Sequence, residues 1–231
     1  MGKNVCGKHQ LCIADKRIAV YPGTAPDGAV VFLNTVAEEG DAVYQAVHQC
    51  GCPNFTLVTI SGLTWDHDMA PWDIPPIAKN DTPCTGGADE YLRLLTEEIV
   101  PRSEDLVPGP VLWRGLAGYS LAGLFAVYSL YQTELFSRIA SMSGSLWFPG
   151  FTEYVFSQEM KICPTHMYFS LGDTEYRTRN PYLKTVQENT EKMERFYAQH
   201  GVDTVFRLNP GGHYRAAVQR TAAGISWLLN R

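Results

Sequence analysis

A serine between small residues is the first feature of this sequence whose residue types and spacing could support catalysis. Residues 111–127 are VLWRGLAGYSLAGLFAV, so the segment GYSLAG lies between two apolar runs. A nucleophilic serine needs such a context, because it stands at a sharp strand-to-helix turn where small neighbours let the two elements approach. Ala122 stands where the usual G-x-S-x-G pattern has its second glycine. We predict that Ser120 is a nucleophile; the alternative is a glycine-rich turn with a capping serine.

A histidine and two acids follow in the chain order that this kind of serine requires. His213 closes an NPGGH turn after an apolar run, and Asp173 and Glu175 share a GDTE turn after an earlier run. An imidazole, with an ordinary pKa of about 6.5, can take the serine proton and return it to a leaving group. Either acid can orient the imidazole. We favour Glu175, a few residues past the expected strand end, and keep Asp173 as the alternative acid; a histidine at a helix N-cap is the alternative for His213.

Backbone amides are expected to stabilise the negative charge that develops on the carbonyl oxygen of a substrate. With Ser120 at a helix start, the amide of Leu121 can donate to this oxyanion, helped by the helix dipole. A second donor is expected in the loop after an early strand. Thr35 and Val36 follow such a run and are equal candidates.

Three aromatic residues are candidates for the substrate pocket. Trp147 follows the expected strand after Ser120, Trp65 lies in the non-periodic stretch 61–86, and Tyr119 directly precedes Ser120. A stretch of this length without periodicity is usually functional or disordered, and its tryptophans and prolines argue against disorder. We therefore expect it to cover the cleft. For Trp147, core or rim packing is the alternative.

The elements that must position these side chains alternate along the chain. Strands are expected at 18–21, 30–34, 55–60, 111–117, 138–142, 166–171 and 204–208, and helices at 38–49, 89–106, 121–131, 182–200 and 213–229. Such alternation predicts an α/β fold with a mostly parallel central sheet and helices on both faces. We expect the first two strands to form a hairpin at the sheet edge and the 231 residues to form a single domain, 1–231.

Charge and composition exclude several classes of partner. The formal net charge of −5 argues against nucleic acid and anionic membranes, which need a basic surface. The sequence holds no apolar stretch near the ~20 residues of a membrane span. Its first twelve residues, MGKNVCGKHQLC, are polar and include no signal-peptide core. We predict a cytoplasmic protein with no membrane partner.

No cofactor or metal site is expected. The six cysteines show no paired spacing of the zinc type, and we interpret them as reduced thiols. His67 and Asp68 are adjacent potential ligands, but no third ligand lies at a convincing spacing.

Several segments together carry a resemblance to a known family. They are GYSLAGLFAVYSL, SRIASMSGSLWFPGF, SLGDTEYRTRNP, the NPGGH turn and GGADEYLRLLTEEIVP. They resemble the putative-esterase family of the α/β-hydrolase superfamily, which includes esterase D-like proteins, feruloyl and acetyl-xylan esterases and siderophore esterases. The likeness covers about residues 30 to 230. It implies an α/β-hydrolase fold without a large lid, ester hydrolysis without a cofactor, and an acid three residues after the strand-end glycine, which is Glu175.

The expected function is a serine carboxylic-ester hydrolase acting on a small-molecule ester. Ser120 would attack the carbonyl, His213 would relay the proton, and water would then cleave the acyl-enzyme. An acyltransferase with the same three residues and a non-catalytic binding protein that keeps the fold are the alternatives.

Overall fold

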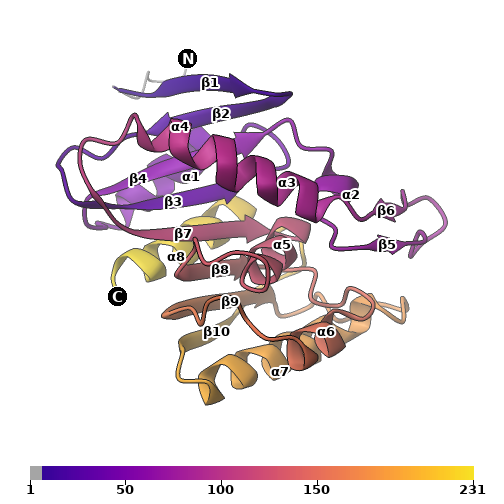
Figure 1. The fold of residues 1–231 in the computed structure, drawn as a ribbon. Coiled ribbons are helices and arrows are strands. Elements are labelled where there is room, and N and C mark those ends of the chain that lie inside the picture. The colour runs from indigo at the N-terminus through magenta and orange to yellow at the C-terminus, as the bar shows by residue number, and fades with distance from the viewer. Residues whose placement is uncertain (1–6) are drawn as a thin grey trace.

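The computed structural model describes residues 7–231, and the Met-Gly start and Cys6 lie outside the described residues. Within this range eight strands form one sheet in the order β1-β2-β4-β3-β7-β8-β9-β10 (Figure 1). They are β1 (His9–Ile13), β2 (Lys16–Tyr21), β3 (Gly28–Asn34), β4 (Phe55–Ser61), β7 (Val111–Tyr119), β8 (Arg138–Met142), β9 (His166–Gly172) and β10 (Asp203–Asn209). All pairings from β4 to β10 are parallel, as predicted.

The predicted hairpin between the first two expected strands is wrong. β2 pairs antiparallel with β1 and with β4, whereas β3 lies between β4 and β7. Every residue of β3 is buried, so the strand needs a partner on each edge and helices over both faces, and an interior position in the sheet provides both. The edge hairpin is formed instead by β1, which pattern reasoning missed, through a tight turn in which Ala14 has a φ of 52°.

Helices cover both faces of the sheet, as predicted. They are α1 (Gly40–Gln49), α3 (Ala88–Leu94), the π-helical turn η1 (Leu95–Ile99), α4 (Val100–Glu104), α5 (Leu121–Ser129), α6 (Phe151–Ser157), the 3-10 turn η2 (Leu183–Thr185), α7 (Val186–Gln199) and α8 (Ala217–Leu229). Side chains of α1 and α8 pack on one face, and those of α3, α5, α6 and α7 pack on the other (Figure 1). None of the helices in residues 7–231 is long and apolar enough to cross a membrane.

The last helix is shorter than predicted. It starts at Ala217 rather than at residue 213, because Ala216 has a left-handed φ of 55° that a continuous helix does not allow. His213 therefore lies in a turn ahead of α8, and the interpretation of His213 as a helix N-cap does not apply.

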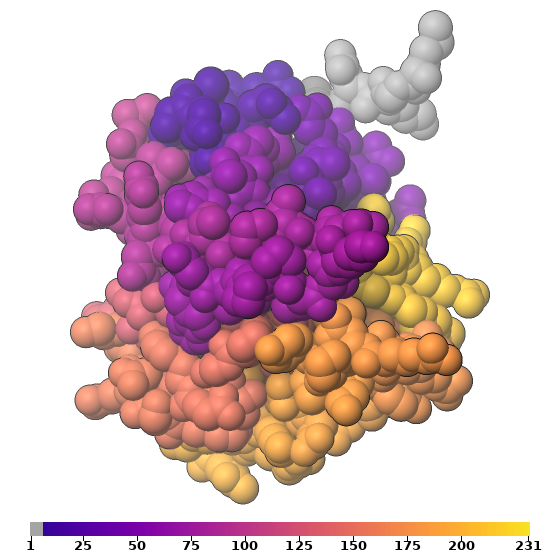
Figure 2. Space-filling model, turned by 90° about the vertical axis from the view of Figure 1, so that its right-hand side faces the viewer, coloured from indigo at the N-terminus to yellow at the C-terminus, as the bar shows by residue number. Residues whose placement is uncertain are grey.

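The non-periodic stretch 61–86 is an ordered excursion from the sheet. It holds the short helix α2 (Trp65–Asp68) and the two-stranded antiparallel pair of β5 (Asp73–Ile74) and β6 (Cys84–Thr85), which project beside α2 (Figure 1). A buried ion pair of 2.8 Å between Lys16 Nζ and Asp68 Oδ2 anchors α2 to the edge hairpin. In the space-filling view this stretch lies against the segment that follows β9 (Figure 2), where Asn180 Nδ2 donates to the carbonyl of Ile77 at 2.8 Å.

Candidate active site

Ser120 stands at the turn between β7 and α5 in a strained backbone conformation. Its φ is 58° and its ψ is −125°, and its side chain makes no capping hydrogen bond to α5. A Cβ built on Gly118 would lie 2.2 Å from the backbone of Ala122, and one built on Gly123 would lie 2.8 Å from Ser141 Oγ. The close approach expected from the GYSLAG segment is therefore present. Strain of this kind persists where the surrounding structure enforces it and is concentrated at functional sites.

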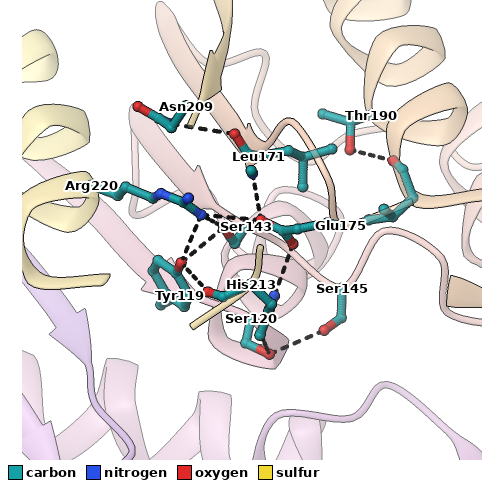
Figure 3. A network of polar contacts seen from close by, with 12 residues as sticks. Tyr119, Ser120, Ser143, Ser145, Leu171, Glu175, Thr190, Asn209, His213 and Arg220 are labelled. Carbon is teal, nitrogen blue, oxygen red and sulfur yellow. Dashed lines mark hydrogen bonds and ion pairs between the residues drawn. The ribbon is translucent and has the colours of Figure 1, made fainter. Parts of the chain in front are cut away.

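Three side chains from three separate loops form a continuous line of hydrogen bonds (Figure 3). His213 Nε2 lies 3.1 Å from Ser120 Oγ, and His213 Nδ1 lies 2.9 Å from Glu175 Oε2. Asp173 does not contact the imidazole; its Oδ1 accepts a hydrogen bond of 2.8 Å from the amide of Gly211. The structure thus places Glu175 against His213, and Asp173 stabilises the turn that carries His213.

The Glu175 carboxylate is buried among hydrogen-bond donors. Its Oε1 accepts from Ser143 Oγ at 2.7 Å and from the amide of Gly172, and it lies 3.2 Å from Arg220 Nη1. Burial raises the pKa of Glu175, but hydrogen bonds from His213, Gly172 and Ser143 outweigh that effect, so the pKa lies below its ordinary value. The carboxylate is therefore ionised at neutral pH and can stabilise an imidazolium.

Tyr119 and Arg220 complete this network; the sequence predicts Tyr119 only as a pocket residue and does not indicate Arg220. Tyr119 Oη donates to the backbone carbonyl of His213 at 2.6 Å, and burial raises the pKa of Tyr119, which keeps the hydroxyl protonated. Arg220 Nη2 donates to the carbonyl of Pro210 at 3.1 Å. An arginine within an amphipathic helix gives no pattern that marks it as part of a site, so no sequence signal distinguishes Arg220.

Two of the three candidate oxyanion donors have a backbone amide without a hydrogen-bond partner among residues 7–231. The amide and the hydroxyl of Thr35 both donate to the carbonyl of Ile60 at 2.9 Å, so the Thr35 amide is already engaged. Within residues 7–231, Val36 N has no backbone or side-chain acceptor. Leu121 N is at the first position of α5, where no helical acceptor exists. The geometry therefore favours Leu121 with Val36 over Leu121 with Thr35.

Two cavities meet at Ser120. One has a volume of about 560 Å³ and the other about 450 Å³, and both are lined by Ser120, His213, Trp65 and Tyr214. Of the expected pocket residues, Trp65 thus borders both cavities. Trp147 lines the larger cavity and Tyr119 the smaller one. An ester whose carbonyl carbon sits at Ser120 has one cavity available for each of its halves.

The cavities differ in chemistry. Polar side chains are frequent in the larger one, which we name the polar cavity: Asp66, Asn80, Asp81, Thr82 and Ser145. Aliphatic and aromatic side chains form most of the lining of the smaller one, which we name the apolar cavity; its aliphatic residues are Leu33, Val36, Val43, Ala217 and Val218.

The potential metal ligands His67 and Asp68 each contact a different protein group, and the described thiols are not paired with one another. His67 Nδ1 contacts Thr85 Oγ1 at 2.8 Å, and Asp68 pairs with Lys16. No cluster of three or more potential His, Cys, Asp or Glu ligands occurs in the part of the chain that the structure describes. The described cysteines are free thiols, and burial raises the pKa of Cys84, which borders the polar cavity, to about 11.

Comparison with known proteins points to one family. The model of the putative esterase family matches residues 27–221. Uncharacterized protein YbbA from Bacillus subtilis (strain 168) is 24% identical over 186 residues, which cover 79% of this chain and 72% of YbbA. Siderophore hydrolase EstA from Aspergillus nidulans has a TM-score of 0.75 at 19% identity, with 100% of this chain and 97% of EstA covered. An IroE-like serine hydrolase from Shewanella oneidensis has a TM-score of 0.76 at 18% identity, with 96% and 79% covered, so both share this fold.

Proposed function

The chain belongs to the putative esterase family, and on this premise we propose that it hydrolyses carboxylic esters through an acyl-enzyme on Ser120. His213 is the general base and Glu175 the third member. The observation that carries the proposal is the unbroken line from Ser120 Oγ to His213 to Glu175, at 3.1 and 2.9 Å, where two cavities meet. The ordering of nucleophile, base and acid in space is the arrangement that serine hydrolases use.

The proposed reaction has two half-reactions. Ser120 Oγ attacks the ester carbonyl carbon while His213 Nε2 takes its proton, and the amides of Leu121 and Val36 bind the oxyanion. The imidazolium, stabilised by the Glu175 carboxylate, gives the proton to the departing alkoxide, which leaves as an alcohol. Water then attacks the acyl-enzyme with His213 as base again, and this step releases the carboxylic acid and restores Ser120.

We further propose that the substrate is a small-molecule ester with a bulky group on each side of the carbonyl. The volumes of about 560 and 450 Å³ support this proposal, because each lies within the range of cavities that hold small ligands. The polar cavity would take the half with more hydrogen-bonding groups, and the apolar cavity the other half. EstA is a siderophore hydrolase and the IroE-like protein is a serine hydrolase, which also supports an ester hydrolase.

The first test combines covalent labelling with turnover. We expect a fluorophosphonate to add once to the protein, and peptide mapping to locate the adduct on Ser120. Ser120→Ala should fold normally, show no adduct, and lose turnover of p-nitrophenyl esters by at least about a thousandfold, because the three residues act as a unit. Retained turnover in this variant would exclude Ser120 as nucleophile. Preferred transfer of the acyl group to an added alcohol, rather than to water, would instead indicate an acyltransferase.

A further inference from the structure

Arg220 of α8 is a buried cation next to the proposed triad (Figure 3). Its side chain is 3% exposed and that of Glu175 is 5% exposed, and Arg220 Nη1 lies 3.2 Å from Glu175 Oε1. Burying a charge is costly even when it is paired. The Nε of Arg220 is buried without a hydrogen-bond partner among residues 7–231, so its burial is not fully compensated. Such a placement is hard to explain by stability alone.

The guanidinium contacts all three segments that carry the triad. Nη1 lies 3.2 Å from Glu175 Oε1 and 3.3 Å from the hydroxyl of Tyr119, which directly precedes Ser120. Nη2 donates to the carbonyl of Pro210, in the turn that ends at His213, at 3.1 Å. On the basis of the proposed function, we propose that Arg220 is a positioning residue that fixes the Glu175 carboxylate and the His213 turn relative to Ser120.

The contacts of Glu175 show how Arg220 would orient the acid. Arg220 and Ser143 both contact Oε1, and Ser143 Oγ itself lies 3.2 Å from Arg220 Nη1. With Oε1 held in this way, Oε2 faces His213 Nδ1 at 2.9 Å. A planar guanidinium with several fixed donors restricts rotation of a carboxylate more than a lysine ammonium does. Without Arg220, the carboxylate is free to turn away from the imidazole.

The test compares Arg220→Met, Arg220→Lys and a control, Arg138→Met. Arg138 is a partly buried arginine at the opposite end of the strands, and its guanidinium donates to the carbonyl of Arg231 at 2.9 Å. For Arg220→Met we expect kcat per fluorophosphonate-titrated site to fall about a hundredfold, as for a misplaced catalytic group, with KM nearly unchanged. Arg220→Lys should lose less kcat, while Arg138→Met should match the wild type per titrated site.

A merely structural role gives a different result. If Arg220→Met and Arg220→Lys lower only the titratable fraction, with kcat per site unchanged, the proposal is wrong. If Arg220→Met does not fold, kcat per titrated site in Arg220→Lys decides. The downfield proton resonance of the His213–Glu175 hydrogen bond provides a readout that does not depend on turnover: it should be lost in Arg220→Met at neutral pH and kept in Arg138→Met. If the resonance is lost in Arg220→Met and kept in Arg138→Met, but the wild-type protein neither labels nor turns over ester, the proposed function is refuted and the positioning by Arg220 is still supported.

Discussion

Two carboxylates, two residues apart in the same turn, have different surroundings, and these surroundings distinguish their proposed roles. Glu175 contacts His213 Nδ1 at 2.9 Å, whereas Asp173 accepts from the amide of Gly211. Glu175→Gln should lower kcat by about a thousandfold or more, because an amide no longer fixes the imidazole tautomer or stabilises the imidazolium. Asp173→Asn should change kcat by less than about tenfold, since it alters only a turn. Steady-state kinetics of the two variants checks this ranking, and the reverse order would move the catalytic acid to Asp173.

The lowered pKa of Glu175 also predicts how stability depends on pH. Burial raises this pKa, and the hydrogen bonds from His213, Gly172 and Ser143 lower it by more. A carboxyl whose folded-state pKa is depressed contributes stability above its ordinary pKa of about 4.3, and this contribution is lost as pH falls through the lower folded-state value. The wild type should therefore be more stable than Glu175→Gln at pH 7, with the difference shrinking steadily below about pH 4.

Urea denaturation at a series of pH values measures this difference. Asp173→Asn is the matched control, because no comparable burial surrounds Asp173, which is exposed. A gap between the wild type and Glu175→Gln that stays constant from pH 7 into the acid range would contradict the prediction.

At the scale of elements, the strand-to-helix turn at Ser120 depends on the absence of a side chain at Gly118. A Cβ there would lie 2.2 Å from the Ala122 carbonyl group, and backbone atoms cannot move aside cheaply. Gly118→Ala should destabilise the fold by about 3 kcal/mol, at the upper end for overpacking, and displace Ser120. Gly212→Ala is the control: its Cβ would meet only Thr174 Oγ1, at 3.6 Å, so stability should change by less than about 0.5 kcal/mol. Thermal unfolding of both variants tests this, and equal stabilities would refute the steric argument.

An element could be predicted where residues close together in the sequence determine it. The strand and helix around Ser120 follow from two adjacent apolar runs, and the parallel sheet follows from their alternation with other runs. The position of β3 inside the sheet was not predicted. A turn-rich connection between two strands suggests a hairpin, but it does not show whether another strand lies between them in the sheet. The start of α8 at Ala217 was missed because the left-handed φ of Ala216 has no sequence signal, such as a glycine, at that position.

At the scale of the whole molecule, the sheet brings together residues that are far apart in the chain. Ser120, Glu175 and His213 each follow a parallel strand, and the carboxyl ends of parallel strands meet at one edge, so their proximity could be predicted. The choice between Thr35 and Val36 depended on a hydrogen bond to Ile60 in a neighbouring strand. Arg220 reaches the site from a helix after the last strand. Contacts of this kind depend on tertiary packing, and patterns along the sequence do not encode them.

The meeting of the two cavities at Ser120 predicts that each half of an ester is recognised separately. Val218 lines the apolar cavity and Asn80 the polar cavity. A tryptophan at either position would occupy one cavity, so each variant should lose activity toward esters enlarged on one side of the carbonyl. Val218→Trp and Asn80→Trp should each lower kcat/KM about tenfold or more for one series and leave the other series nearly unchanged.

Two substrate series measure this division, one with a fixed alcohol and a growing acyl group, the other with a fixed acetyl group and a growing alcohol. Gln219→Trp is the control, because Gln219 is an exposed neighbour of Val218 on α8 and does not line either cavity. If the two cavities hold different halves of the ester, Val218→Trp and Asn80→Trp must affect opposite series. Variants that affect the same series would mean that one cavity alone receives substrate, because the carbonyl carbon at Ser120 fixes where the two halves of an ester diverge.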